Sequence, residues 1–544
     1  MKKIKLVLIS AGSFALLTTS LTGCRGVKEG EDEYDPTKAN IVVATLDKGI
    51  GTEWLVNAAR EFEELYKDST EFEDGKTGVK VSIKGSDSLD GEYLQINNLN
   101  DDIYFTEGIS YRELINKGKV LDITSTVNEK LTAYGENKSI MDKIEDSLTD
   151  YLTVNGKIYG VPFYDSFYGL VYDMDLWNER QLYISKTGQF VSKSGDLSLG
   201  TDHVAGTLDD GLPATYEEFG KLITKMKNKN ITPYICSNNG IEYTANYLYN
   251  IFADYEGLDN MRMNITLSGT ANDLINLNDD GTYSYLPATP ITEDNGYMLQ
   301  KQEGRYKTLK LFNDTLISSQ ENYICASTHI VAQHDFIFNK EVADKPIGMI
   351  VEGSWWENEA RYTLATYQDQ YKKRTNYAIM PIPFENEAKA AEKNYKHTYL
   401  SLSHSFGLVS SSTQNRKLAL EFMKFLHTDK MLSKFTRDTS ITRPLNYEIT
   451  AEDQANLSTY AKSLIDLKKN SNVFYPYSSN QLQVDNNLVF NAFNWTWNTM
   501  VDGIKYRHPW MYFSAKDLAH TATPEAYFKG QYSYFESVWE GLNR

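Results

Sequence analysis

The order of hydrophobic and polar positions predicts a strand, a helix and a second strand at the start of the folded chain. Residues 41–46 (IVVATL) form a continuous apolar run, which is typical of a buried strand. Residues 79–83 (VKVSI) alternate between apolar and polar positions, which predicts a strand with one buried face. The segment between them places apolar side chains on one helical face, at Leu55, Ala58, Ala59, Phe62 and Leu65.

A hinge is predicted further along the chain, between two β-prone runs. Residues 157–162 (KIYGVP) predict a short strand that stops at Pro162, because proline cannot donate a hydrogen bond to a strand ladder. A second run follows at residues 167–172 (FYGLVY). The residues between the runs lie where the chain would pass from one sheet to another, so we expect a hinge beside a cleft. The polar candidates for ligand contact in this stretch are Tyr164, Asp165 and Ser166.

The amino terminus has the pattern of a bacterial lipoprotein signal. Lysines precede an apolar run at residues 6–17, which is too short for a stable membrane span. The following LTGC at residues 21–24 resembles a lipobox. Residues 1–23 are therefore predicted to be a signal peptide, and lipid on Cys24 would anchor an extracytoplasmic protein to the cell membrane. The alternative is an ordinary cysteine after an ordinary signal. Residues 25–39, acidic and poor in apolar side chains, predict a flexible tether.

Composition places the rest of the chain among folded multidomain proteins. A chain of 544 residues suits two or three domains, and 41% hydrophobic with 24% charged residues is typical of a globular protein. The formal net charge of −18 argues against a nucleic-acid partner, which needs a basic surface. The 38 tyrosines would suit a wet cleft for a polyhydroxylated ligand, and they fit an ordinary tyrosine-rich surface equally well.

Five phrases along the chain form an ordered series. They are residues 159–162 (YGVP), 213–219 (PATYEEF), 346–356 (PIGMIVEGSWW), 377–383 (YAIMPIP) and 405–427, which end in NRKLALEFMKFLH. In this order they resemble the extracellular solute-binding proteins of carbohydrate ABC importers, the family that includes maltose-binding protein. The resemblance runs from about residue 40 to about residue 450.

The resemblance implies an α/β fold of the periplasmic-binding-protein type (class II), with two lobes joined by a hinge. The N-terminal lobe would contain residues 40–162 and 399–442, and the C-terminal lobe residues 163–398 and 443–544. Residues 183–211 would be an inserted hairpin. Ligand binding would close the lobes about the hinge. The crossings between the lobes are expected near Pro162, Thr398 and Arg443.

The same resemblance assigns ligand contacts to loops and strand ends between the lobes. In this family a tryptophan after a buried strand stacks on a sugar ring, which points to Trp355 or Trp356. Neighbouring polar groups would exchange hydrogen bonds with sugar hydroxyls. The further candidates are Asp47, Lys48, Thr106, Glu107, Glu352, Ser354, Arg443 and Trp495.

The function implied is that of a monomeric binding protein. It would capture a carbohydrate, expected to be an oligosaccharide, and deliver it to the permease subunits of an ABC importer. No catalytic residue, cofactor or metal site is predicted. The main alternative is a lipid-anchored glycan-degrading hydrolase that uses Glu352 and Glu357 as an acid and base pair. Another alternative is a binding protein for a non-sugar solute.

Two smaller questions stay open in the sequence. Cys236 and Cys325 could pair in an exported protein, or they could be two buried free thiols. Residues 276–287 faintly resemble an EF-hand calcium loop, but position twelve is Pro287, where calcium binding needs a glutamate. A hairpin turn at Asp280-Gly281 is therefore predicted there.

Overall fold

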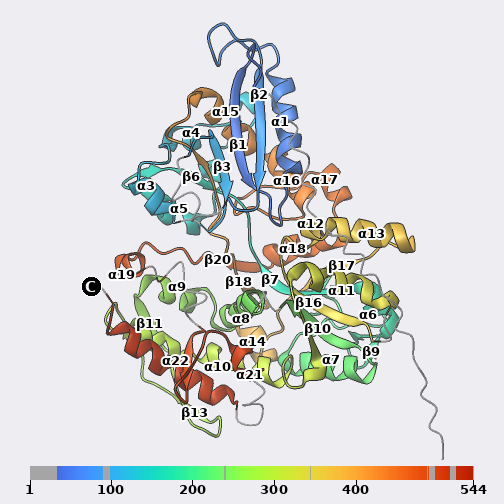
Figure 1. Cartoon of the computed structure of the whole chain (residues 1–544). Helices are drawn as coiled ribbons and strands as arrows, with labels where there is room; N and C mark the ends of the chain where they lie inside the picture. The colour runs from blue at the N-terminus through green and yellow to red at the C-terminus, as the bar shows by residue number, and fades with distance from the viewer. Residues whose placement is uncertain are drawn as a thin grey trace, which may run out of the picture.

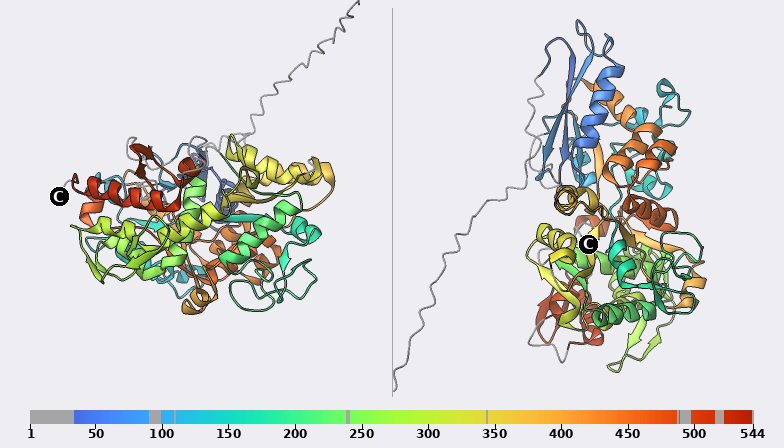
Figure 2. Two further views of the ribbon diagram at one scale, coloured as in Figure 1. Left: turned by 90° about the horizontal axis from the view of Figure 1, so that it is seen from below. Right: turned by 90° about the vertical axis from the view of Figure 1, so that its right-hand side faces the viewer.

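The computed structural model of the chain describes residues 34–89, 99–108, 110–237, 241–342, 345–486, 488, 497–514 and 522–542. Cys24 and Trp495, with the predicted signal peptide, lie outside the described residues. The described part forms two α/β lobes, one above the other in Figure 1 and in the right-hand view of Figure 2. None of its helices is both long enough and apolar enough to cross a membrane.

The first lobe is built around a five-stranded sheet in the order β2-β1-β3-β19-β6. β1 (Ala39–Leu46) is parallel to β2 (Val79–Ser86) and β3 (Ile103–Thr106). β19 (Phe406–Val409) runs antiparallel to β3 and to β6 (Gly160–Pro162), so a late segment of the chain completes an early sheet. The helices of this part are α1 (Glu53–Leu65), α3 (Tyr111–Asn116), α4 (Thr124–Asn128), α5 (Asp146–Leu152), α15 (Arg416–Leu426), α16 (Asp429–Thr439) and α17 (Ala451–Asn456).

Helix α1 shows how the hydrophobic pattern becomes packing. Phe62 lies against Phe422 and Phe425 of α15, with ring centroids 4.9 and 5.2 Å apart. Full burial of a phenylalanine side chain contributes about 1.5–3 kcal/mol. The prediction that Leu65 shares this face is wrong, because Leu65 is 56% exposed at the end of the helix. Tyr66 continues the packed face instead, with its ring 4.7 Å from that of Phe62.

The second lobe has its own five-stranded sheet, in the order β15-β10-β16-β7-β17. β10 (Thr232–Ser237) is parallel to β15 (Tyr323–Ala326), which forms the edge, and to β16 (Ile347–Gly353). β7 (Tyr168–Asp173) runs antiparallel to β16 and to β17 (Tyr377–Met380). The helices of this part are α6 (Met174–Arg180), α7 (Tyr216–Asn228), α8 (Ile241–Glu256), α9 (Leu258–Thr266), α10 (Glu303–Asp314), α11 (His329–Val342), α12 (Trp356–Glu359), α13 (Arg361–Tyr371), α14 (Glu387–Glu392), α18 (Thr459–Lys469), α19 (Gln481–Asp485), α21 (Pro509–Phe513) and α22 (Pro524–Trp539).

Short strand pairs lie outside the two sheets. β12 (Ile275–Leu277) and β13 (Tyr283–Tyr285) are antiparallel, and Gly281 between them has a φ of 82°, a left-handed value that favours glycine. The predicted turn at Asp280-Gly281 is therefore confirmed. The other pairs are β4 (Thr153–Val154) with β5 (Lys157–Ile158), β8 (Tyr183–Ile184) with β9 (Phe190–Val191), β11 (Gly269–Ala271) with β14 (Thr289–Ile291), β18 (His397–Leu400) with β20 (Ser471–Phe474), and β21 (Thr499–Val501) with β22 (Ile504–Tyr506).

Candidate functional site

Three chain crossings meet between the two sheets, and we call them together the hinge bundle. The first crossing, residues 163–167, connects β6 of one sheet to β7 of the other. The second, residues 401–405, leads from β18 into β19, and the third, residues 440–445, follows α16. Backbone hydrogen bonds join the first crossing to both others. Segments that are far apart in the sequence therefore hold one another at the junction of the lobes.

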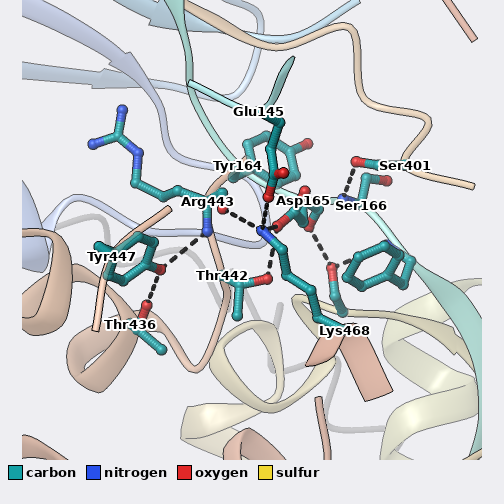
Figure 3. Close-up of polar contacts among 12 residues, drawn as sticks. Glu145, Tyr164, Asp165, Ser166, Ser401, Thr436, Thr442, Arg443, Tyr447 and Lys468 are labelled. Atoms are coloured by element: carbon teal, nitrogen blue, oxygen red, sulfur yellow. Dashed lines mark hydrogen bonds and ion pairs between the residues drawn. The ribbon is translucent and has the colours of Figure 1, made fainter. Parts of the chain in front are cut away.

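Asp165 is the central side chain of the hinge bundle (Figure 3). It is fully buried. The Thr442 hydroxyl and the Lys468 ammonium donate to its Oδ2 at 2.8 Å each, and the Tyr475 hydroxyl donates to its Oδ1 at 2.9 Å. A buried carboxylate is tolerated when its charge is paired and its oxygens accept hydrogen bonds, and both conditions are met here. Asp165 therefore ties the first crossing to the third and to α18.

Lys468 connects the hinge bundle to the first lobe. Figure 3 shows its ammonium between the carboxylates of Asp165 and Glu145, and the Lys468 to Glu145 ion pair measures 3.4 Å. It also donates to the Arg443 carbonyl at 2.6 Å. Burial disfavours the charge, but the two carboxylates outweigh it and raise the pKa of Lys468. The lysine therefore stays charged in a nearly dry environment.

Arg443 is fully buried; its Nε and Nη2 bond within the protein, whereas its buried Nη1 has no hydrogen-bond partner among the described residues. Its Nε donates to the Phe163 carbonyl at 2.7 Å, and its Nη2 donates to the Pro162 carbonyl at 3.0 Å. Nη2 also lies 2.8 Å from Nε2 of His427. Burial and the guanidinium charge hold the pKa of His427 well below its usual range, so this imidazole is neutral and accepts that hydrogen bond. Arg443 therefore stabilises the first crossing.

Serine side chains join the second crossing to the first. The backbone N–H of Ser166 donates to the Ser401 hydroxyl at 3.0 Å, as Figure 3 shows. The Ser403 hydroxyl donates to the Tyr164 carbonyl at 3.2 Å, and the Ser405 hydroxyl accepts from the Tyr164 N–H at 3.3 Å. Hydroxyl groups can rotate to new partners, which suits a hinge better than a continuous strand ladder does. The serines at alternate positions of residues 401–405 are a sequence signal for this crossing, which the predicted crossing near Thr398 did not use.

Trp355 lies where the second lobe touches the first. It lies two residues after Gly353, the end of β16, and its ring meets Tyr168 and Tyr243 edge to face at centroid distances of 5.2 and 6.0 Å. Gly49, in the loop after β1 of the first lobe, also lies against this ring. A Cβ at Gly49 would come within 2.9 Å of the Trp355 ring, and its φ of 65° is also left-handed. Only glycine allows the two lobes to approach this closely here.

Hydrogen bonds reinforce this contact between the lobes. Nδ2 of Asn358, in α12, donates to the Gly49 carbonyl at 2.8 Å and to the Ile50 carbonyl. Glu357, the neighbour of Asn358, accepts from the Ser440 hydroxyl at 2.7 Å and from the Ser458 hydroxyl at 2.6 Å. The residues just after Trp355 therefore link the second lobe to the loop after β1 and to the third crossing.

A pair of acids lies near Tyr243, which packs against Trp355. Glu352 is fully buried, and Nε2 of Gln333 donates to it at 3.0 Å and to Glu359 at 2.5 Å. Burial, and then repulsion from Glu359, raises the pKa of Glu352 well above its usual value. Burial also raises the pKa of Glu359, although His329 opposes the shift. Two carboxyl groups therefore share one amide donor, which leaves acceptor capacity for a ligand hydroxyl.

The candidates from the first crossing and the first lobe do not form one cluster of contacts. Tyr164 donates its hydroxyl hydrogen bond to Glu107, at the end of β3. The buried Thr106 hydroxyl donates to the Leu89 carbonyl at 2.8 Å. Lys48 is exposed, while Asp47 is half-buried. Burial, and then Asp87, raises the pKa of Asp47.

The last two candidates, Trp356 and Ser354, pack in the second lobe and against the first crossing, respectively. Trp356 is enclosed by Phe336, Tyr377 and Tyr460. The Ser354 hydroxyl donates to the Asp165 carbonyl at 2.9 Å. The residues that sequence reasoning missed are Tyr168, Tyr243, Gln333, Asn358 and Glu359.

Comparisons with known proteins agree with this architecture. A family profile described as bacterial extracellular solute-binding protein matches residues 61–463. No curated protein sequence matches the chain. Among solved structures, RafE in complex with raffinose is 14% identical, with 92% of this chain and 100% of that chain covered and a TM-score of 0.54.

Two further solved structures have the same fold. The apo form of RafE from Streptococcus pneumoniae is 14% identical, covers 93% of this chain and 100% of its own, and has a TM-score of 0.52. The GacH receptor of Streptomyces glaucescens, solved unliganded and with acarbose, is 13% identical, with the same coverage and a TM-score of 0.54. The predicted two-lobe α/β fold is therefore confirmed. Because the family profile covers well over half of its length, the chain belongs to the bacterial extracellular solute-binding proteins.

Proposed function

We propose that the solute is a carbohydrate, specifically an oligosaccharide, and that the protein delivers it to the permease of an ABC importer. The observation that carries the proposal is the group around Trp355. In this group the Trp355 indole packs against Tyr168 and Tyr243, and the acids Glu352 and Glu359 lie near Tyr243. The indole also contacts Gly49 of the other lobe. The structural neighbours RafE and GacH, solved with raffinose and acarbose, support the same class of ligand.

The chemistry of this group suits a sugar. A pyranose ring presents a face of C–H bonds that packs on an aromatic ring, and its hydroxyls donate hydrogen bonds to carboxylates. A buried acceptor that lacks its partner is costly, so matched hydroxyls would decide which sugar binds. We propose direct ligand contacts from Trp355, Tyr168, Tyr243, Glu352, Glu359, Asp47, Glu107 and Tyr164.

The hinge bundle gives this site a means of closure. Asp165, Ser166, Ser354 and Arg443 are proposed to hold the crossings about which the lobes move, because their polar atoms bond to other crossing residues. A sugar that contacts both lobes would favour the closed arrangement by its differential affinity for it. Ligand contact by Lys48, Thr106, Trp356 and Trp495 stays a prediction from the sequence.

The membrane part of the proposal comes from the sequence. The family is extracellular, and we propose that lipid on Cys24 anchors the protein to the outer face of the cell membrane. Two acyl chains are sufficient for stable attachment, so no spanning helix is needed. Radiolabelled fatty acid should be incorporated by the wild-type chain and lost in the Cys24→Ala variant; incorporation into the variant would contradict the proposal.

The test of ligand class is a calorimetric titration with a panel of oligosaccharides, followed by recovery of each sugar. Saturable binding with the sugar recovered intact is expected. Cleavage of a sugar would favour the hydrolase, in which Glu357 would have to give up its bonds to Ser440 and Ser458. Binding of peptides or other solutes, with no response to any sugar, would overturn the carbohydrate assignment.

A further inference from the structure

Two cysteines lie side by side on neighbouring strands of the second sheet. The register of β10 and β15 places Cys236 opposite Cys325, and their sulfur atoms are 4.0 Å apart. Both are free thiols. The alternative of two buried thiols is wrong for Cys325, which is exposed because β15 is the edge strand and only one of its sides is paired.

We propose that Cys236 and Cys325 form a redox-active pair that closes to a disulfide when it meets a disulfide oxidant. Opposite residues on adjacent strands are about 4.8 Å apart, within the roughly 4.4–6.8 Å range of Cα separations that disulfides span. The sulfurs must shorten their 4.0 Å separation to a bond of about 2.05 Å. A change of side-chain rotamer supplies that movement without displacing the backbone.

The two thiols differ in the way that such a pair requires. The hydrogen bond from Cys236 lowers the pKa of the exposed Cys325, although burial opposes the shift. The same hydrogen bond, together with burial, raises the pKa of Cys236. Because the thiolate is the nucleophile in disulfide exchange, the accessible cysteine reacts first and the buried cysteine resolves the product.

The oxidant is an external disulfide, such as oxidised glutathione or a thiol–disulfide oxidoreductase. The Cys325 thiolate attacks one sulfur, the external S–S bond breaks, and one thiolate leaves. Cys236 then loses its proton and attacks the Cys325 sulfur, which releases the second thiolate. The two cysteines lose two electrons and two protons in total, and the oxidant is reduced to two thiols.

The extracellular environment and the position of the two cysteines indicate what a disulfide between them would do. The family is extracellular, where disulfides persist. β15 runs on toward α11, which carries Gln333, and β10 leads toward α8, which carries Tyr243. A disulfide would therefore clamp the edge strand β15 to β10, which lies beside β16, the strand that carries Glu352. Only this consequence for ligand affinity rests on the proposed function.

The test treats the folded full-length protein with oxidised glutathione and then blocks the remaining thiols with N-ethylmaleimide in denaturant. One portion is digested without reduction, and a second portion is reduced and labelled with iodoacetamide. Peptide mass spectrometry then reports each cysteine separately, independently of Cys24. We expect both Cys236 and Cys325 to lose their reaction with N-ethylmaleimide and to appear as one linked peptide. Two thiols that stay reactive, or a glutathione adduct on Cys325 with no linked peptide, would overturn the proposal.

Two variants make the mechanism specific. In Cys236→Ser, the exposed thiol should accumulate a stable glutathione adduct, because no resolving cysteine is present. In Cys325→Ser, the buried Cys236 should stay unmodified; its modification would contradict the order of attack. Hydrogen exchange in β15 should be slower in the oxidised wild type than in the reduced one. Failure of both redox forms to bind any sugar would count against the proposed function and leave the disulfide result intact.

Discussion

Two buried carboxylates at the junction of the lobes are held in opposite ways. Asp165 receives three side-chain donors, one of them the cationic Lys468. Glu352 receives an amide of Gln333 and a backbone N–H, and it lies near a second acid, Glu359. Among the described residues no cation is bonded to it. The first is a completed network. The second keeps acceptor capacity that a ligand can use.

The difference separates a structural role from the proposed binding role at nearly the same place in the fold. A completed buried ion pair resists change, because removal of one partner leaves an uncompensated charge. Acids with raised pKa values and few donors destabilise the protein without its ligand, and such groups gather at functional sites. Mutations in the hinge bundle should therefore mainly lower the free energy of unfolding. Mutations in the group around Trp355 should mainly lower the affinity for the ligand.

The largest expected effect comes from Lys468→Met, which leaves Asp165 buried without its cation. Loss of one partner of a buried pair costs about 3–5 kcal/mol in free energy of unfolding. Urea titration would measure it, with Lys469→Met, the exposed neighbour on α18, as the control. Equal stability of the two variants would contradict the claim that Asp165 depends on its ion pair with Lys468. The double variant Lys468→Met with Asp165→Asn should recover part of the loss.

The adjacent residues Trp355 and Trp356 offer the sharpest test of the distinction between affinity and stability. Trp356→Ala should destabilise the protein by about 3–5 kcal/mol, because Trp356 is enclosed in the core of the second lobe. Trp355→Ala should weaken binding of the best sugar in the panel by about 30-fold, equivalent to about 2 kcal/mol, with a smaller effect on stability. Thermal unfolding and calorimetry on both variants decide this. A reversed pattern would assign the stacking role to Trp356.

Glu352→Gln should raise stability at pH 7 while it lowers affinity. The pKa of Glu352 in the folded state lies above its ordinary value of 4.5, so the native state binds more protons between these values. Stability therefore falls as pH rises from 4.5 through the folded-state pKa, and the glutamine removes that contribution. Urea titrations at several pH values would measure the difference. The exposed Glu448→Gln makes the same substitution on the surface and is the control.

The smallest expected effect is that of Asn358→Ala, which removes the hydrogen bonds from α12 to the loop after β1. A hydrogen bond contributes about 0.5–1.5 kcal/mol, so the closed arrangement should lose roughly this amount and affinity should fall by several-fold. Small-angle scattering should show a more open protein. Asn376→Ala is the control, because Asn376 bonds to Asp175 within the second lobe. An equal change in both variants would argue against a contact specific to closure.

The sequence determined much of the local structure and the place of the hinge. A run that stops at Pro162, followed at once by a second β-prone run, corresponds to β6, the first crossing and β7. The apolar face of α1, the turn at Asp280-Gly281 and a tryptophan after a buried strand were also readable. These features depend on side chains a few residues apart, whose spacing decides helix, strand or turn.

Only the tertiary structure decided which partners these elements bring together. Lys468 and Asp165 are 303 positions apart, and their ion pair exists because α18 packs beside the first crossing. The sequence could not separate the environments of the two tryptophans. In the structure Trp356 is enclosed by aromatic side chains of the second lobe, while the Trp355 ring lies against Gly49 of the first lobe. Gln333 and Tyr243 reach the same site from separate helices. The spacing of neighbouring residues does not encode these long-range contacts, because they follow from the order of strands in the two sheets.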